Sequence, residues 1–340
     1  MPVYKLASNQ FDHFYRGGNR IGALRRGPGG PMRPEEWIGS TTTRFGHSVA
    51  GLTTLPTGEL LRDSIEADPV VWLGEEHVAA FGSSTELLVK LLDLDQRLPV
   101  HFHPNKKFAS EHLALNHGKT EAWIILEAPV GATVGLGFKE ERTKEEILKL
   151  VNERDSEGLL ASLARFPAQR GDAFLVPAGT PHAIESEVFL LELQEPTDLS
   201  ALLEWNEFAV DGEKDGHLGL GFDTVLDSLH YSPIQNEEMK NLFTTGLAFG
   251  ESDASLFSSH ADPFFRAHYL TGNHSIIDAG FSIVVIFDGN GLLEFENADP
   301  LSVTKGDAIV VSHSLGSWKL IGARAIVSRP PLPSEARRSQ

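Results

Sequence analysis

The chain of 340 residues contains no cysteine. Disulfide bonds and thiolate chemistry are therefore excluded, whether structural, catalytic or metal-binding. Any bound metal ion must be held by histidine, by acidic side chains or by glutamine. The candidate metal ligands are thus limited to residue types whose spacing can be followed directly in the sequence.

Positive charge is also scarce, because 29 Lys and Arg residues stand against 47 Asp and Glu residues, a formal net charge of −18. This excess of negative charge argues against binding to nucleic acid or to anionic membranes. No stretch approaches the roughly 20 apolar residues of a membrane span, and the first residues, MPVYKLASNQ, lack the order of a signal peptide. We therefore expect a cytoplasmic protein.

Short apolar runs between turns dominate the chain, in keeping with its 32 Gly and 19 Pro residues. This pattern favours antiparallel β-barrels or sandwiches over a doubly wound sheet, and no glycine-rich phosphate motif opens a helix. Residues 139–165 differ, because apolar residues at helical spacing predict two amphipathic helices interrupted near Gly158. The sequence DGNG at 288–291 predicts a β-hairpin.

The segment LPVHFHPNKKFASEHLALNHGKTEAW, residues 98–123, concentrates histidines between two apolar runs. The runs predict a strand, a loop and a second strand. Because side chains alternate between the faces of a strand, His101 and His103 point to the same side and can share one metal ion. Taken alone, such a pair is more typical of surface histidines.

A second segment, GDAFLVPAGTPHAIESE at 171–187, has the spacing G-x5-P-x-G-x2-H from Gly171 to His182. A strand follows the glycine turn, and the proline and the second glycine end it, so that the histidine stands just beyond the bend. This pattern resembles the second motif of the cupin superfamily, and the HxH pair with a following glutamate resembles the first.

The long spacing between His103 and Glu121 is unusual among cupins but resembles one branch, the type I mannose-6-phosphate isomerases. Similar segments are LLVKLLDLDQRLPVHFHPNKKFA, GKTEAWIIL, PEEWIGS, LLELQEPTD and KGDAIVVSHSLGSWKL. The resemblance implies a mainly β fold of two cupin-type β-barrels (jelly-roll) with a small helical insertion. It divides the chain into a catalytic metal-binding cupin domain at 1–235 with the insertion at about 139–166, a second, metal-free cupin domain at 236–332, and a tail at 333–340.

The resemblance also implies an activity, a metal-dependent aldose–ketose isomerase that converts mannose 6-phosphate to fructose 6-phosphate as a monomer or homodimer. The implied metal ligands are His101, His103, Glu121 and His182. The implied catalytic residues are Lys119 and Glu192, and the implied substrate-binding residues are Gln194, Lys214 and His217. Zinc is the expected ion, with manganese, cobalt or iron as alternatives, because His101 stands where the family usually has glutamine and imidazole binds divalent ions more tightly.

One departure concerns the substrate. Members of the family carry arginine after the segment that matches LLELQEPTD, whereas TDLSALLEWNEF at 197–208 contains none. This loss weakens the case for a phosphorylated sugar. It leaves open an isomerase of an unphosphorylated aldose and a non-catalytic sugar-binding cupin. A metal-dependent cupin dioxygenase is a further alternative, because His101 in place of glutamine makes the ligand set similar to that of such enzymes. The N-terminal residues Arg16, Arg20, Arg25 and Arg26 are interpreted as a solvated loop in preference to an anion site.

Overall fold

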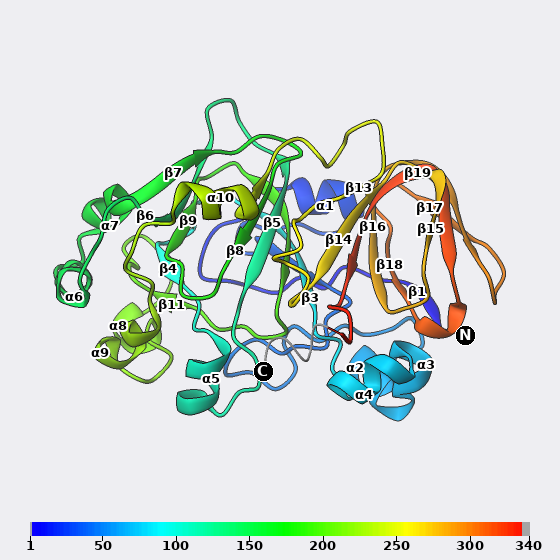
Figure 1. Ribbon diagram of the computed structural model, residues 1–340, viewed down its shortest axis with the longest axis horizontal. Coiled ribbons are helices and arrows are strands. Elements are labelled where there is room, and N and C mark those ends of the chain that lie inside the picture. The colour runs from blue at the N-terminus through cyan, green and yellow to red at the C-terminus, as the bar shows by residue number, and fades with distance from the viewer. Residues whose placement is uncertain (1, 335–340) are drawn as a thin grey trace.

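The computed structural model describes residues 2–334 and is built mainly from antiparallel β-sheets. Residues 35–244 form two sheets that face each other, and the C-terminal third forms most of a third sheet beside them (Figure 1). The predicted mainly β fold is confirmed. Most of the predicted tail at 333–340 lies outside the described residues.

The central sheet has six strands in the order β12-β8-β5-β10-β3-β2. Its strands are β2 (Glu35–Ile38), β3 (Leu88–Asp93), β5 (Glu121–Glu127), β8 (Ala173–Val176), β10 (Phe189–Gln194) and β12 (Phe243–Thr244). Side chains of β5 alternate, so that Trp123 and Ile125 pack in one apolar cluster while Ala122 and Ile124 pack in another. The sheet is therefore covered on both faces.

The face of the central sheet that carries Trp123 packs against a five-stranded sheet in the order β11-β4-β9-β6-β7. Its strands are β4 (His101–Phe102), β6 (Thr133–Phe138), β7 (Leu163–Pro167), β9 (His182–Ile184) and β11 (Ala201–Leu202). The opposite face packs against an eight-stranded sheet. That sheet contains β1 (Val3–Lys5), β13 (Ala254–Ser255), β14 (Arg266–Leu270), β15 (Asn273–Ile277), β16 (Ser282–Phe295), β17 (Leu301–Thr304), β18 (Ala308–Val311) and β19 (Trp318–Arg329).

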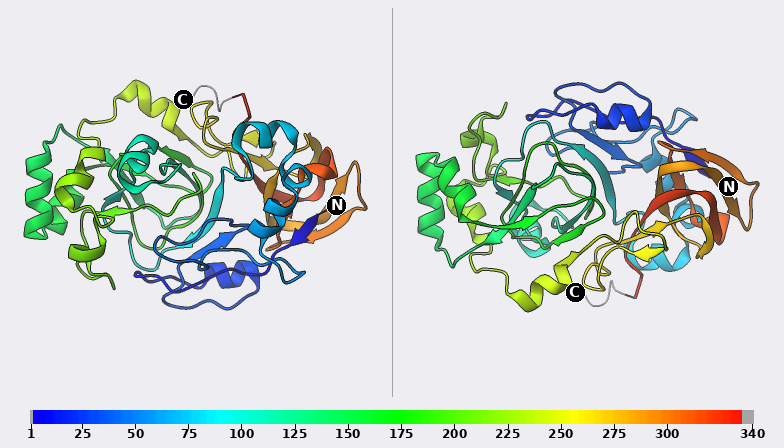
Figure 2. Two further views of the ribbon diagram at one scale, coloured as in Figure 1. Left: turned by 90° about the horizontal axis from the view of Figure 1, so that it is seen from below. Right: turned by 90° about the horizontal axis from the view of Figure 1, so that it is seen from above.

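Helices cover the edges of this arrangement, as the views from below and from above in Figure 2 show. They are α1 (Arg20–Arg25), α2 (Leu61–Ala67), α3 (Pro69–Leu73), α4 (Glu75–Phe81), α5 (Lys106–Leu113), α6 (Lys144–Glu153), α7 (Ser156–Ser162), α8 (Gly212–Asp215), α9 (Phe222–Val225) and α10 (Asn236–Leu242), with 3-10 turns at Leu226–Ser228 and His313–Leu315. Among the described residues, no helix is both long enough and apolar enough to cross a bilayer.

The helical insertion is present as α6 and α7, but the predicted break near Gly158 is wrong. Helix α6 ends at Arg154, which adopts a left-handed conformation with φ 55°. Asp155 then caps α7, since its carboxylate accepts the backbone N–H of Gly158. Gly158 therefore lies inside the second helix, and a capping side chain determines where the helices separate.

The hairpin predicted at DGNG is also wrong, because residues 288–291 lie in the middle of the single strand β16. The pairing of β16 with β19 shifts register between Ile286 and Asp288 and again between Gly289 and Leu292. Gly289 has φ +77°, so the glycine serves an irregularity in a long strand. The predicted domain boundary after residue 235 stays a prediction, and two pairings cross it, β1 with β18 and β12 with β8.

Candidate metal centre

Three histidines and one glutamate converge between the two sheets of the sandwich. His101 lies on β4 directly opposite His182 on β9, and His103 follows β4 on the same side as His101. Glu121 is the first residue of β5 in the facing sheet. The two sheets thus supply ligand atoms from opposite sides of a common point.

The ligand atoms are close enough to bind one ion. The Nε2 atoms of His101 and His182 are 3.0 Å apart. The Glu121 carboxylate lies 2.9 Å from His103 Nε2 and 3.3 Å from His182 Nε2. Two nitrogens bound at about 2.1 Å to one ion stand roughly 3 to 3.5 Å apart. The observed spacing therefore fits a single divalent ion.

Backbone carbonyls set the tautomer of each imidazole. Nδ1 of His101, His103 and His182 donates to the carbonyl oxygens of Pro99, Leu199 and Thr180 at 2.8, 2.6 and 2.9 Å. Since a carbonyl only accepts, Nδ1 carries the proton and Nε2 of the neutral ring presents a lone pair. Such outer hydrogen bonds orient metal-binding histidines and raise their basicity.

The charge states of these groups also suit a cation. Burial lowers the pKa of His103 and of His182 to about 3 and holds the pKa of His101 well below its usual value. Burial raises the pKa of Glu121, but Lys119 and His103 outweigh it and keep that pKa low. Neutral imidazoles and an ionised carboxylate are the forms that bind metal.

His103 Nε2 makes no hydrogen bond, and Glu121 Oε2, 2.9 Å away, is paired with the Lys119 ammonium group. Because the His103 proton lies on Nδ1, the two facing atoms are both acceptors, and a metal ion would satisfy both at once. The other Glu121 oxygen accepts from Trp123 Nε1 at 2.9 Å. The side chains of His101, His103 and His182 form a buried group whose ligand atoms all lie within 4.8 Å of one another. This group can hold a metal ion.

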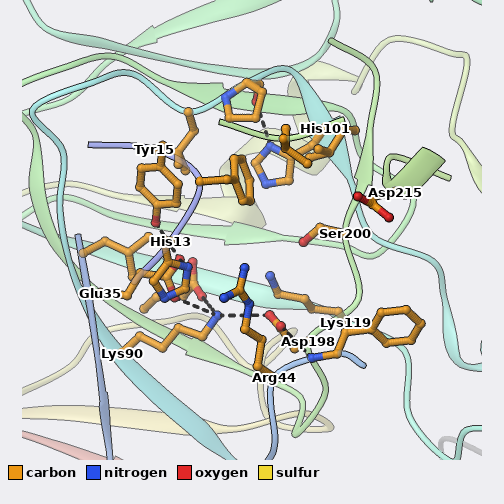
Figure 3. A pocket seen from close by; sticks show the side chains of 18 of the residues that line it. His13, Tyr15, Glu35, Arg44, Lys90, His101, Lys119, Asp198, Ser200 and Asp215 are labelled. Atoms are coloured by element: carbon orange, nitrogen blue, oxygen red, sulfur yellow. Dashed lines mark hydrogen bonds and ion pairs between the residues drawn. The ribbon is translucent and has the colours of Figure 1, made fainter. Parts of the chain in front are cut away.

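A cavity of about 190 Å³ opens beside the metal centre and reaches His101, Lys119 and Glu192 (Figure 3). Lys119 Nζ lies 3.2 Å from the Glu121 carboxylate. Burial, followed by the negative charge of Glu121, raises the pKa of Glu192 to about 7. The Glu192 carboxyl group can therefore gain and lose a proton near neutral pH. One of its oxygens, Oε1, makes no hydrogen bond.

The cavity has a second group of charged side chains, which the sequence motifs do not identify as site residues. Lys90 on β3 lies 3.5 Å from both Glu35 and Glu192 and 3.9 Å from Asp198. Glu35 also accepts from the Tyr15 hydroxyl at 2.5 Å. His13, between β1 and α1, and Arg44, in the loop after β2, complete this wall. Lys90 and Glu35 lie within quoted motifs, whereas His13 and Arg44 lie in segments without a recognisable pattern.

The three predicted substrate-binding residues lie in different surroundings. Gln194 is fully buried at the end of β10, and its Nε2 donates to backbone carbonyls of Glu195 and Thr197. Lys214 is exposed on α8. His217 Nδ1 accepts from Gly221 N at 3.0 Å, and its Nε2 lies 2.9 Å from the Glu213 carbonyl oxygen. The cavity wall contains the neighbouring Asp215 and Leu218 and not these three side chains. Their predicted contact with substrate stays a prediction.

A histidine- and glutamate-lined centre between antiparallel sheets is typical of the metal-binding sites of cupins. Comparison with known proteins narrows this class, although no protein-family model matches the chain. A mannose-6-phosphate isomerase of Streptococcus mutans is 28% identical over 87% of this chain and 95% of its own length. The isomerase ManA of Bacillus subtilis is 30% identical over 75% of this chain and 80% of its own length. The chain belongs to the mannose-6-phosphate isomerase family.

Solved structures agree on the fold. A putative mannosephosphate isomerase from Archaeoglobus fulgidus aligns with a TM-score of 0.75 at 18% identity, covering 97% of each chain. The Bacillus subtilis mannose 6-phosphate isomerase aligns with a TM-score of 0.71 at 22% identity, covering 97% of this chain and 100% of that chain. The cupin fold expected from the motifs is thereby confirmed, and so is the family resemblance.

Proposed function

We propose that this protein is a metal-dependent aldose–ketose isomerase that interconverts mannose 6-phosphate and fructose 6-phosphate. The observation that supports it is a cavity, lined by His101, Lys119 and a glutamate of raised pKa, beside a centre of three histidines and one glutamate. The names and coverage of the relatives support the same reaction and substrate.

His101, His103, Glu121 and His182 would hold one divalent ion, with zinc as the proposed metal. When bound, the ion supplies Lewis acidity to the sugar oxygens without redox chemistry. The four side chains are suited to hold it tightly because they are buried and, for the histidines, oriented by backbone carbonyls. Their donor set of nitrogen and carboxylate oxygen is one that zinc accepts.

Glu192 is proposed as the base that moves a proton between the two carbons of the isomerising pair. A general base works best when its pKa lies near the operating pH, and burial with the Glu121 charge raises the pKa of Glu192 to about 7. Lys119, whose ammonium group borders the cavity, is proposed to donate a hydrogen bond to the sugar oxygen on which negative charge develops. Lys90 would hold the Glu192 carboxylate in place across 3.5 Å.

Proton NMR in deuterium oxide tests this function. We expect metal-loaded protein to interconvert mannose 6-phosphate and fructose 6-phosphate, with activity lost after chelation and regained with zinc. Glu192→Gln should lower kcat by at least about 100-fold, because general-base catalysis contributes on the order of 10²–10⁴ in rate. The same assay with free mannose and free fructose tests whether the substrate is unphosphorylated. The proposal fails if no sugar reacts with zinc, manganese, cobalt or iron; oxygen consumption under those conditions would support a dioxygenase.

A cytoplasmic location and a monomeric or dimeric state complete the proposal. Cell fractionation and light scattering of the purified protein test these two statements directly. Nucleic acid is not expected to bind, given the formal net charge of −18.

A further inference from the structure

Arg44 places a guanidinium group in the wall of the sugar cavity. It lies in the loop that follows β2, far in sequence from the metal ligands, and it shares the cavity wall with His13, Lys90 and Lys119. Figure 3 shows its side chain extending into the cavity toward the region of Lys119. Its positive charge lowers the pKa of His13, after the larger effect of burial.

Within residues 2–334, Arg44 has no carboxylate partner at ion-pair distance. Its Nη1 donates to the backbone oxygen of Asp12 at 3.0 Å, and its other side-chain donors have no partner among these residues. The four arginines of the N-terminal segment differ, since each pairs with an acidic side chain. These are Arg16 with Asp95, Arg20 with Asp93, Arg25 with Glu36 and Arg26 with Asp307. An acidic protein therefore leaves one cavity-lining arginine free for a ligand.

The loop that carries Arg44 is held by a hydrogen bond to Asp198, which also lines the cavity. The backbone N–H of Phe45 donates to Asp198 Oδ2 at 3.0 Å, and the Arg44 N–H donates to the Ala50 carbonyl at 2.7 Å. Asp198 in turn faces Lys90 through its second oxygen. The segment after Asp198, up to Phe208, contains no Lys or Arg. The loop after β2 thus brings to the cavity wall an arginine that the segment after β10 does not supply.

Arg44 also borders a second hollow of about 560 Å³, together with the rest of its loop and residues 196–199. Its side chain therefore lies between this hollow and the cavity beside the metal centre. A sugar whose reacting carbons face His101 would have Arg44 in the same cavity wall as a contact for another part of the molecule. A guanidinium group matches phosphate oxygens through two parallel N–H donors, which a single ammonium group does not provide.

We propose that Arg44 binds the phosphate group of a sugar monophosphate and so determines the preference for a phosphorylated substrate. This inference rests on the proposed function, because it assumes that a sugar occupies the cavity. It supplies the cationic contact that the arginine-free segment after β10 lacks.

Isothermal titration with glucitol 6-phosphate tests the contact without turnover, since a sugar alcohol has no carbonyl to isomerise. Metal-loaded wild-type protein should bind it more tightly than glucitol. Arg44→Gln should weaken that binding by about 10- to 100-fold, the loss expected when a charged hydrogen-bonding group is removed. Arg44→Lys should recover part of the loss, and binding of glucitol should stay unchanged. Arg16→Gln, which removes an equal charge from an exposed ion pair, is the matched control and should bind like wild type.

Kinetics separates phosphate binding from a role in the chemical step. Arg44→Gln should raise KM for mannose 6-phosphate with little change in kcat. Equal binding by wild type and Arg44→Gln, an equal loss in Arg16→Gln, or a fall in kcat without a change in binding would each overturn the inference. Tighter binding of glucitol than of glucitol 6-phosphate by the wild type would overturn it too. The NMR assay with free sugars would still test the isomerase activity separately in that case.

Discussion

At the scale of single residues, His103 and His182 are buried so deeply that they resist protonation. Burial lowers the pKa of each imidazole to about 3, whereas a histidine in an unfolded chain takes up its proton near pH 6.5. Between these values the unfolded state binds more protons than the folded state. The free energy of unfolding must then fall as the pH drops from about 6.5 toward 3.

We expect the metal-free protein to lose about 1.4 kcal/mol of stability per pH unit from each of these histidines between about pH 4 and 6. Urea unfolding at several pH values, with a chelator present, measures the slope. The variant His103→Gln with His182→Gln should show a clearly shallower slope. Glu192 acts in the opposite sense, because its pKa of about 7 makes the folded state hold an extra proton, but it is present in both proteins. Parallel pH profiles would contradict the explanation.

At the scale of elements, the sequence was sufficient to predict that the histidines carried by regular strands lie close together. The HxH spacing follows from strand alternation, and the break after Pro177 places His182 beside His101. Long-range loop contacts are not encoded in such local patterns. The backbone of Phe45, next to Arg44, meets Asp198 only because the loop after β2 folds over the end of β10, and no periodicity predicts that contact. Two other predictions failed because glycine was taken to mark a break in an element. The helices separate at Asp155, which caps α7, and not at Gly158. The glycines of β16 accompany register shifts within a continuous strand and not a hairpin turn.

The hydrogen bond between the Phe45 N–H and Asp198 leads to a prediction about the loop that carries Arg44. Asp198→Ala removes the acceptor of the Phe45 N–H, so hydrogen exchange of residues 41–50 should become faster. Binding of glucitol 6-phosphate should weaken by less than in Arg44→Gln, because the guanidinium remains but is held less firmly. Asp155→Ala, which removes a cap on α7, a helix that contributes no residue to the cavity wall, should leave both measurements unchanged. Unchanged exchange at 41–50 in Asp198→Ala would show that other contacts hold the loop.

At the scale of the whole molecule, the six-stranded sheet belongs to two cores at once. One face packs on the sheet with the three histidines, and the other packs on the eight-stranded sheet. Strand β1 begins the chain but joins the eight-stranded sheet beside β18. The two cupin units proposed from the sequence therefore share a large apolar contact, and we expect them to unfold together.

Arg25 provides a test of this cooperativity, because it joins the N-terminal segment to both units. Its buried guanidinium pairs with Glu36 on β2 at 2.8 Å, and it also donates to the carbonyls of Leu6 and of Gly306 before β18. Removing one partner of a buried ion pair costs about 3–5 kcal/mol. Arg25→Met should therefore shift one common urea transition, observed both by tryptophan fluorescence and by circular dichroism, to lower concentration.

Two further variants separate the buried charge from the loss of packing. Arg25→Met with Glu36→Met should recover much of the stability, since the uncompensated carboxylate is removed. Arg26→Met breaks the more exposed pair with Asp307 and should cost less than about 1 kcal/mol. Two resolved transitions, in the wild type or in Arg25→Met, would mean that the units unfold separately and that the shared sheet does not couple them. If both probes instead follow one common transition in each protein, the units unfold together. The stability of the metal centre then depends on contacts with the eight-stranded sheet on the opposite face of the central sheet.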